Sequence, residues 1–377
     1  MGVALYAYPW NIHDIDADIA RVKALGADEI SLAVSYHAGK FIHPGDPKAR
    51  VYFPEDGTVY FRPRRAYGAL RPQVSQLTQG RDVLAELCAR GDIGVNAWTV
   101  LNHNTRLGMS RPDLCAHNAF GDIYPYSLCP SQAEVRAYGV SLCTDIAEGY
   151  AVKSLLLESP GWLTYGHGFH HEFAQVPANA WLDRMLGLCF CAACQSDAKA
   201  AGIDAEGLAA QVRGAVDRFL EDGQAPSLES ELVAYHRFRC EVVTALVRDI
   251  RAAVKPEVKV KVISTCQRPH ATAWLEGHDL AALDAVSDGL ELPLYQPDAA
   301  AVLADGRYVL DRVPAARTSV ILRPGHPDLT AEADLVAALD GLKALGIQDF
   351  AFYNLGMLRP ADLRRLQHVL AKQVQHV

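Results

Sequence analysis

Residues 318–354 read TSVILRPGHPDLTAEADLVAALDGLKALGIQDFAFYN, and this stretch decides the fold. It opens with an apolar run at 318–323 and closes with another at 349–354, each with the length and composition of a buried strand. Between them, apolar residues at helical spacing predict a helix over 331–345. A strand, a helix and a second strand in such a short span form a unit whose two strands lie parallel.

The same alternation runs through the whole chain of 377 residues. Six further apolar runs predict strands at 3–9, 29–36, 93–101, 154–158, 258–264 and 288–295. The segments that predict helices are 15–25, 75–90, 132–148, 228–254, 331–345 and 360–374. Eight strands alternating with helices predict an α/β fold, a (β/α)8 TIM barrel with its helices outside. We expect residues 1–377 to form this single barrel domain.

A short repeat supports the barrel. Lys-Ala-Leu-Gly occurs at 23–26 and again at 343–346, and each copy places Gly directly after a predicted helix. Glycine is common there because it adopts the left-handed conformation that ends many helices. An acidic residue and a strand follow both copies, so the same helix-to-strand connection recurs near the two ends of the chain.

The strands are unevenly spaced. The last four follow one another at intervals close to a minimal strand–helix–strand unit. Long insertions instead follow the strands at 29–36, 93–101 and 154–158; they cover about 37–70, 102–130 and 159–215. All three follow the carboxyl ends of strands, where barrel enzymes build their active sites. We therefore expect the functional site on that face.

Composition excludes several partners and compartments. The net charge of −8 offers no basic excess for nucleic acid or an anionic membrane. No apolar run reaches the ~18 residues of a membrane helix, and residues 1–10 read as a strand rather than a signal peptide. Nine cysteines, three of them clustered, suit a cytoplasmic metal protein better than a secreted disulfide framework. The composition is also compatible with a homo-oligomer.

Three cysteines predict a metal site. Cys189, Cys191 and Cys194 form a C-x-C-x-x-C motif, and thiolates select Zn²⁺ in a cytosolic setting. A structural zinc needs a fourth ligand, for which Cys129 is the best candidate. The alternatives are Cys115, His170 and His171. Such a closed site would brace the insertions at about 102–130 and 159–215 against each other.

The sequence around Cys129 also predicts its place in the fold. Ser131 and Glu134 have the S-x-x-E spacing of a capping box, which places Cys129 in the loop just before a helix.

Two carboxylates lie on predicted barrel strands. Glu158 ends the run Ser154-Leu155-Leu156-Leu157-Glu158, and Glu291 lies inside the strand at 288–295. A carboxyl group in such a place is costly to bury unless it is used or paired. Burial also raises its pKa towards the range of a general acid. Glycoside hydrolysis needs two such groups facing one cavity. Glu172 competes with Glu291 for the second role.

Aromatic and polar residues gather at other strand ends and in the insertions. Sugars present apolar ring faces and many hydroxyl groups, so this mixture suits a carbohydrate. The candidate substrate-binding residues are Trp10, His37, Trp98, His103, Trp162, His171, Glu172, Tyr295, Arg323, Tyr353 and Asn354.

The order of these motifs resembles the glycoside hydrolase family 42 β-galactosidases. In that family a cysteine before a barrel helix and a C-x-C-x-x-C form a four-cysteine zinc site, and an acid/base Glu ends the fourth strand. Carried over by position, the resemblance implies Cys129, Cys189, Cys191 and Cys194 as ligands and Glu158 as the acid/base. It covers about residues 120–195, roughly a fifth of the chain.

The chain also departs from that family. Family 42 has Asn before the strand-four Glu, where this chain has Leu157, and its nucleophile is a Glu on the seventh strand. The predicted seventh strand at 318–323 contains none, and Glu291 lies on the sixth. The chain is also much shorter than those enzymes. The β-galactosidase specificity is therefore not carried over.

We expect a glycoside hydrolase that acts on a small glycoside or oligosaccharide through Glu158 and Glu291, with a structural zinc. One alternative is a metal- or histidine-dependent hydrolase or lyase that uses histidines of the insertions. The other is a barrel that binds carbohydrate without catalysis.

Overall fold

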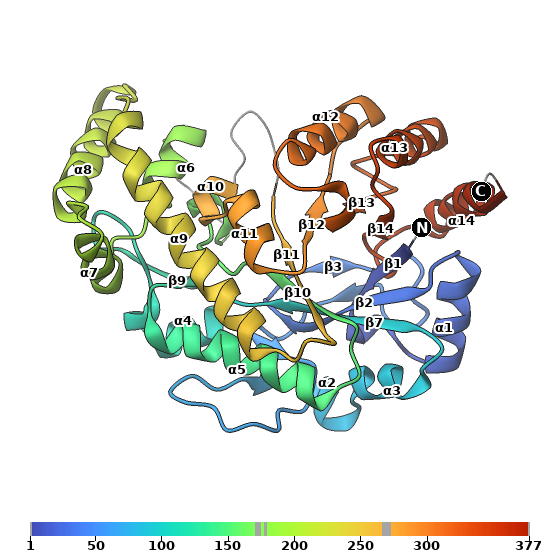
Figure 1. The fold of residues 1–377 in the computed structure, drawn as a ribbon. Helices are drawn as coiled ribbons and strands as arrows, with labels where there is room; N and C mark the ends of the chain where they lie inside the picture. Colours follow the sequence, from blue (N-terminus) through green and yellow to red (C-terminus); the bar gives the residue numbers. More distant parts are fainter. Residues whose placement is uncertain (1, 170–174, 177–178, 266–272, 376–377) are drawn as a thin grey trace.

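The computed structural model describes residues 2–169, 175–176, 179–265 and 273–375, and its centre is a closed barrel (Figure 1). Eight parallel strands form the barrel: β1 (Gly2–Ala7), β2 (Glu29–Tyr36), β7 (Gly94–Val100), β10 (Ser154–Glu158), β11 (Lys259–Ile263), β12 (Leu290–Pro293), β13 (Thr318–Leu322) and β14 (Asp349–Phe352). Strand β1 pairs with both β2 and β14, which closes the sheet into a ring. Each predicted strand matches one of these, so the predicted (β/α)8 barrel is confirmed.

The helices that follow the barrel strands surround the barrel (Figure 1). They are α1 (Ile15–Ala24), α3 (Val83–Arg90), α5 (Ala133–Gly149), α9 (Glu229–Ala253), α11 (Leu280–Val286), α12 (Ala299–Leu310), α13 (Glu332–Ala344) and α14 (Pro360–Gln375). The helix expected over 75–90 is divided into α2 (Gln76–Gly80) and α3. The reason is local: Arg81 is extended, and the Asp82 side chain caps α3 by accepting a hydrogen bond from Ala85 N.

The repeated Lys-Ala-Leu-Gly motif ends two helices as predicted. Gly26 follows α1 with a φ of +86°, and Gly346 follows α13 with a φ of +94°. Both values lie in the left-handed region that glycine adopts without a steric penalty.

The predicted capping box at Ser131 and Glu134 is wrong. Helix α5 begins at Ala133, with Gln132 as its N-cap and no capping bond from a side chain. The Glu134 carboxylate instead accepts a hydrogen bond from Arg111 at 2.7 Å, and the Ser131 hydroxyl lies 3.4 Å from the Cys194 thiol. The helix starts later than predicted because both side chains have partners elsewhere.

The three insertions follow the carboxyl ends of β2, β7 and β10, as expected. The first holds β3 (Phe41–Ile42), β4 (Val51–Tyr52) and β5 (Thr58–Val59), and β6 (Gln73–Val74) follows it; the second holds α4 (Thr105–Ser110), β8 (Cys115–His117) and β9 (Ile123–Leu128).

The third insertion is more helical than the loop expected from the sequence. It holds α6 (Ala180–Leu186), α7 (Ala192–Ala200) and α8 (Ala205–Asp222). These helices pack with the first half of α9 around a hydrophobic cluster of their own, which includes Met185, Val212 and Tyr235.

The barrel interior differs between its two ends. Towards the carboxyl ends of the strands, inward-facing Tyr6, Tyr8 and Trp98 belong to an aromatic cluster. Towards the amino ends, the side chains are polar and line a cavity that includes Asn96 and Glu291. Within the described residues, no helix is both long and apolar enough to cross a membrane.

Candidate active site and metal centre

Glu158 is the last residue of β10 and lies half-buried on the carboxyl-end face of the barrel. Its Oε2 accepts a hydrogen bond from the indole Nε1 of Trp98 on the neighbouring strand β7. Burial raises the pKa of Glu158 to about 7, and the bond from Trp98 opposes that rise. A carboxyl group with this pKa can hold a proton at neutral pH and release it to a substrate.

A hydrogen-bonded group of tyrosines lies near this carboxyl. The Tyr8 hydroxyl lies 3.0 Å from that of Tyr36 and 2.6 Å from that of Tyr353, so three rings are joined by hydrogen bonds. Burial raises the pKa of Tyr36 and Tyr353, and the negative charge of Glu158 adds to both shifts. Both hydroxyl groups therefore lie within electrostatic reach of Glu158.

A second carboxyl group, which the sequence analysis missed, lies beside this site. Glu276 ends the short helix α10 (Ala273–Glu276), which follows β11, and its backbone oxygen accepts a hydrogen bond from Trp162 N at 3.1 Å. This contact joins Glu276 to the turn that directly follows Glu158. Burial raises the pKa of Glu276 to about 8, and the negative charge of Glu158 contributes.

The Glu276 carboxylate is held by neighbouring polar groups. Its Oε2 accepts a hydrogen bond from the Thr265 hydroxyl at 3.2 Å and lies 3.5 Å from Nδ1 of His278. Burial lowers the pKa of His278 to about 3, so the imidazole is neutral at pH 7. Arg239 fixes the preceding residue by donating a hydrogen bond to Leu275 O at 2.7 Å.

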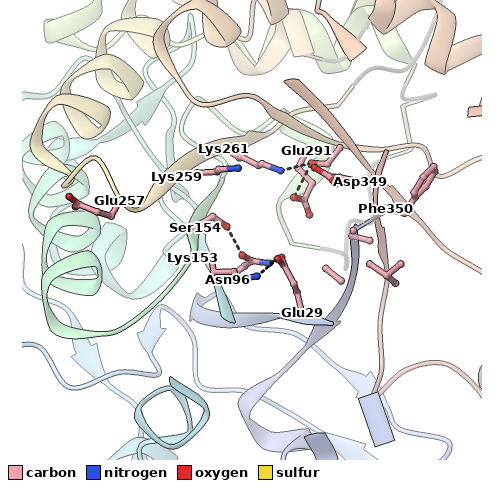
Figure 2. Close-up of a pocket in the computed structure, with 15 residues that line it drawn as sticks. Glu29, Asn96, Lys153, Ser154, Glu257, Lys259, Lys261, Glu291, Asp349 and Phe350 are labelled. Atoms are coloured by element: carbon pink, nitrogen blue, oxygen red, sulfur yellow. Dashed lines mark hydrogen bonds and ion pairs between the residues drawn. The ribbon is translucent and has the colours of Figure 1, made fainter. Parts of the chain in front are cut away.

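Glu291 lies towards the opposite end of the barrel. It lines a cavity of about 350 Å³ formed by the first residues of the strands, among them Gly2, Ser154 and Asp349 (Figure 2). Its Oε1 accepts a hydrogen bond from the Tyr6 hydroxyl at 2.7 Å. Burial raises the pKa of Glu291. Glu291 thus lines the amino-end cavity, and its charge, like that of Glu158, adds to the effect of burial in raising the pKa of Tyr6 and Tyr295.

Several other polar groups in this cavity are paired. Lys153 donates to Glu29 at 2.8 Å, and Asn96 also donates to Glu29, at 2.7 Å (Figure 2). Lys261 donates to the Ser319 hydroxyl at 3.2 Å, which in turn donates to Glu291 at the same distance. The bonds of Asn96, Ser319 and Glu291 satisfy buried polar groups, whereas the Lys153 side chain is 58% exposed. We infer that these paired polar side chains close the barrel at the amino ends of its strands.

Several predicted substrate-binding residues are enclosed. Trp10 is sandwiched between Tyr8 and Tyr52, with ring centroids 4.5 Å and 4.9 Å away. Trp162 is 1% exposed, and the Arg239 guanidinium lies 4.5 Å from its ring centroid. A sugar could not stack on either ring without displacing these groups.

Two further candidates are also buried. Asn354 is fully buried, and its Oδ1 accepts a hydrogen bond from Gly356 N at 3.0 Å. Trp98 is buried as well, and the structure assigns its indole to Glu158.

The remaining described candidates are half-buried on the carboxyl-end face. His37 and His103, from two different insertions, stack with ring centroids 3.9 Å apart. Tyr295 and Tyr353 have ring centroids 5.9 Å apart, and the Arg323 guanidinium lies over Tyr295. The predicted residues His171 and Glu172, and the alternative ligand His170, lie outside the described residues.

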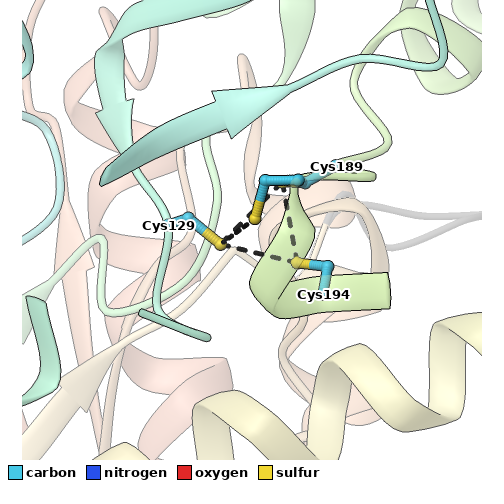
Figure 3. A group of neighbouring side chains, drawn as sticks. Cys129, Cys189 and Cys194 are labelled. Carbon is cyan, nitrogen blue, oxygen red and sulfur yellow. Dashed lines mark hydrogen bonds between the residues drawn. The ribbon is translucent and has the colours of Figure 1, made fainter. Parts of the chain in front are cut away.

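Four cysteines from the second and third insertions meet, and Figure 3 labels three of them, Cys129, Cys189 and Cys194. Cys129 follows β9, and Cys189, Cys191 and Cys194 lie at the start of α7. The Cys129 Sγ is 3.5 Å from that of Cys194, 3.8 Å from that of Cys189 and 3.6 Å from that of Cys191. The predicted grouping with Cys129 is confirmed.

These distances fit a metal ion and exclude disulfides. A disulfide bond needs ~2.05 Å between its sulfurs, whereas four sulfurs ~2.3 Å from one tetrahedral zinc lie about 3.8 Å apart. All four thiols are buried, and His117 N donates to the Cys189 sulfur at 3.4 Å. Such outer bonds are typical of metal–thiolate sites. The alternative ligand Cys115 lies outside the group and bonds to Gly108 O.

Comparison with known proteins shows the fold. No protein-family model matches the sequence, and no curated protein matches it. The glycoside hydrolase domain of PgaB (BpsB) from Bordetella bronchiseptica is 15% identical, with a TM-score of 0.63 over 98% of this chain and 99% of that one.

Two other solved structures are similar over nearly the whole chain. The catalytic domain of β-amylase from Paenibacillus polymyxa is 10% identical, with a TM-score of 0.61 over 99% of this chain and 98% of that one. The β-galactosidase from the psychrophilic Marinomonas ef1 is 10% identical, with a TM-score of 0.59 over 99% of this chain and 60% of that longer one. At these identities, the similarity shows a shared barrel fold.

Proposed function

We propose that this protein is a glycoside hydrolase, with Glu158 as its general acid/base and Glu276 as the second carboxylate. The observation that carries the proposal is the Glu158 carboxyl itself. It ends a barrel strand on the face that barrel enzymes use, is bonded to Trp98 and has a pKa of about 7. Glu276 lies beside the turn that follows it.

The two carboxyls have complementary roles in this proposal. Burial and the negative charge of Glu158 raise the pKa of Glu276, so around neutral pH the two carboxyls together hold about one proton. With pKa values of about 7 and about 8 the shared proton can lie on either carboxyl; when it lies on Glu158, Glu158 donates it to the glycosidic oxygen as the bond to the sugar breaks, which yields a neutral leaving group. The ionised group attacks the anomeric carbon or removes a proton from the attacking water.

Glu276 replaces Glu291 in this role because of its position. Glu291 bonds to Tyr6 and Ser319 and lines the cavity at the amino-end mouth. Glu276 follows the carboxyl end of β11, on the same face as Glu158. Its signal in the sequence was weak, because it lies in a connection rather than a strand.

The known folds also support the proposal. The similar structures carry the names of a glycoside hydrolase domain, a β-amylase and a β-galactosidase. All three names describe action on glycosidic bonds, which favours a carbohydrate substrate here. Their differing names favour no particular sugar, so we propose a small glycoside or oligosaccharide.

We also propose that the four cysteines hold a structural Zn²⁺. Zinc with four thiolates keeps no open position for substrate, so its contribution would be to fix the two insertions. Among the described residues, these cysteines form the one group close enough to hold a metal. The stacked pair of His37 and His103 does not belong to such a group, and the other two histidines of the histidine-dependent alternative, His170 and His171, lie outside the described residues.

Substitution of Glu158 tests the function. Glu158→Gln keeps the shape of the side chain and should lower kcat/KM on the hydrolysed glycoside at least ~10³-fold. It should spare glycosides with highly activated leaving groups more, because these need less help from an acid. Glu257→Gln, at an exposed carboxyl by the other mouth, is the control. Full activity of Glu158→Gln, or no hydrolysis of any glycoside by the unaltered protein, would contradict the proposed function.

A further inference from the structure

Arg323 directly follows β13 on the same face as Glu158. Its Nε donates a hydrogen bond to the Asp328 carboxylate at 2.5 Å, and Asp328 is only 5% exposed. The bond uses one edge of the guanidinium. The buried Asp328 carboxylate thus fixes the position of the arginine through its Nε.

A second contact fixes the plane of the guanidinium. Its central carbon lies 4.6 Å from the centroid of the Tyr295 ring, a geometry of attraction between a cation and an aromatic face. Among the described residues, none accepts a hydrogen bond from Nη1 or Nη2 of Arg323. The side chain is 30% exposed, so these donors remain accessible to a ligand.

Tyr295 and Tyr353 connect this cation to the candidate active site. Burial raises the pKa of each tyrosine most; the negative charge of Glu158 adds to that rise and the positive charge of Arg323 opposes it. Both charges therefore act on the same two hydroxyl groups. A sugar held beside Glu158 would lie within reach of the free edge of Arg323 if it also contacted these tyrosines.

We propose that Arg323 binds an anionic substituent of the substrate, a carboxylate or a sulfate ester, and so selects acidic sugars. A planar guanidinium with two free donors binds such a group through paired hydrogen bonds. A neutral sugar would offer Nη1 and Nη2 of Arg323 no charged acceptor. The proposal names a substrate class for the proposed glycoside hydrolase and rests on it for the position of the sugar.

Binding of sugar acids to the whole protein tests the proposal without requiring turnover. Glucuronate, galacturonate and galactose 6-sulfate are compared with glucose and galactose by saturation-transfer NMR and calorimetry. At least one acidic sugar should bind about 10-fold or more tightly than its neutral parent, and which one binds distinguishes carboxylate from sulfate. The preference should weaken with salt.

Variants assign the preference to Arg323. Arg323→Met should abolish the preference for the acidic sugar, and Arg323→Lys should keep part of it because the charge remains. Arg323→Met combined with Asp328→Asn avoids leaving a buried carboxylate unpaired and should behave like Arg323→Met. Arg312→Met removes an exposed arginine that also lies over a tyrosine, Tyr308, and should change nothing.

Two results would overturn the proposal. One is equal binding of acidic and neutral sugars, or no acidic sugar bound; the other is a preference unchanged in the folded double variant. Either could occur while Glu158→Gln still abolishes hydrolysis of a neutral glycoside. Failure of the proposed selectivity is thus distinguishable from failure of the proposed function.

Discussion

The indole of Trp98 donates its hydrogen bond to the Glu158 carboxylate across two adjacent strands, β7 and β10. The strand register places Trp98 opposite Leu156, one inward-facing position below Glu158. The donor is therefore built into the rigid barrel. It stabilises the charged form of Glu158 and opposes the effect of burial on the pKa of that carboxyl.

Trp98→Phe should raise the pKa of Glu158, because the variant keeps the aromatic packing and loses the N–H donor. A hydrogen bond to a charged group contributes about 1.5–3 kcal/mol, so the shift should be roughly one pKa unit or more. We expect one limb of the pH profile of kcat/KM to move to higher pH by that amount. Trp10→Phe, in the same aromatic cluster and without a bond to Glu158, should leave the profile in place. Superimposable profiles for Trp98→Phe and the unaltered protein would contradict the assignment.

The unaltered protein should have a narrow pH optimum. Activity requires one proton on the pair of Glu158 and Glu276, whose pKa values are raised to about 7 and about 8. The rate should therefore rise as the first carboxyl ionises and fall as the second does. Glu276→Gln should remove one limb and lower kcat with little change in KM. A flat profile between pH 5 and pH 9 would exclude this pair.

The barrel could be predicted from the sequence because its eight apolar runs have the length of buried strands and alternate with segments of helical periodicity. The thiol group could be predicted because three cysteines within six residues restrict where a fourth can lie. The position of Glu291 could not. Alternation shows which face of a strand a side chain occupies, but the height of that residue in a closed barrel depends on the register of all eight strands.

The roles of individual aromatic residues also could not be predicted from the sequence. Trp162 follows a barrel strand as a sugar platform would, yet its ring packs against the buried Arg239 from the distant helix α9. Glu276 was missed for a related reason. It becomes important only because the chain brings it against the turn after Glu158, a contact between residues far apart in the sequence.

The four cysteines should bind about one zinc ion per chain, measurable by elemental analysis. Cys129→Ser removes one thiolate and should lower both the zinc content and the melting temperature, because the second and third insertions lose their shared anchor. Cys115→Ser is a matched control, since this buried thiol is close in sequence to Cys129 but outside the group. Full zinc content in Cys129→Ser, or equal losses in both variants, would contradict the assignment.

Glu276 should destabilise the folded protein at alkaline pH. Its pKa is about 8 in the folded state, against an ordinary value of 4.5. Between these values the folded state keeps a proton that the unfolded chain releases, so the contribution of Glu276 to stability falls as the pH rises through that window. Above it, the folded protein carries a poorly solvated charge.

Glu276→Gln removes this charge while keeping an acceptor for the Thr265 hydroxyl. The variant should match the unaltered protein in stability near pH 4.5 and exceed it at pH 9. With the side chain 23% exposed, the excess should be on the order of 3 kcal/mol, measured by urea denaturation. Glu257→Gln, at an exposed position, should give no such divergence. Parallel stability curves for Glu276→Gln and the unaltered protein would show that Glu276 ionises freely, and it would then be unsuited to share a proton with Glu158.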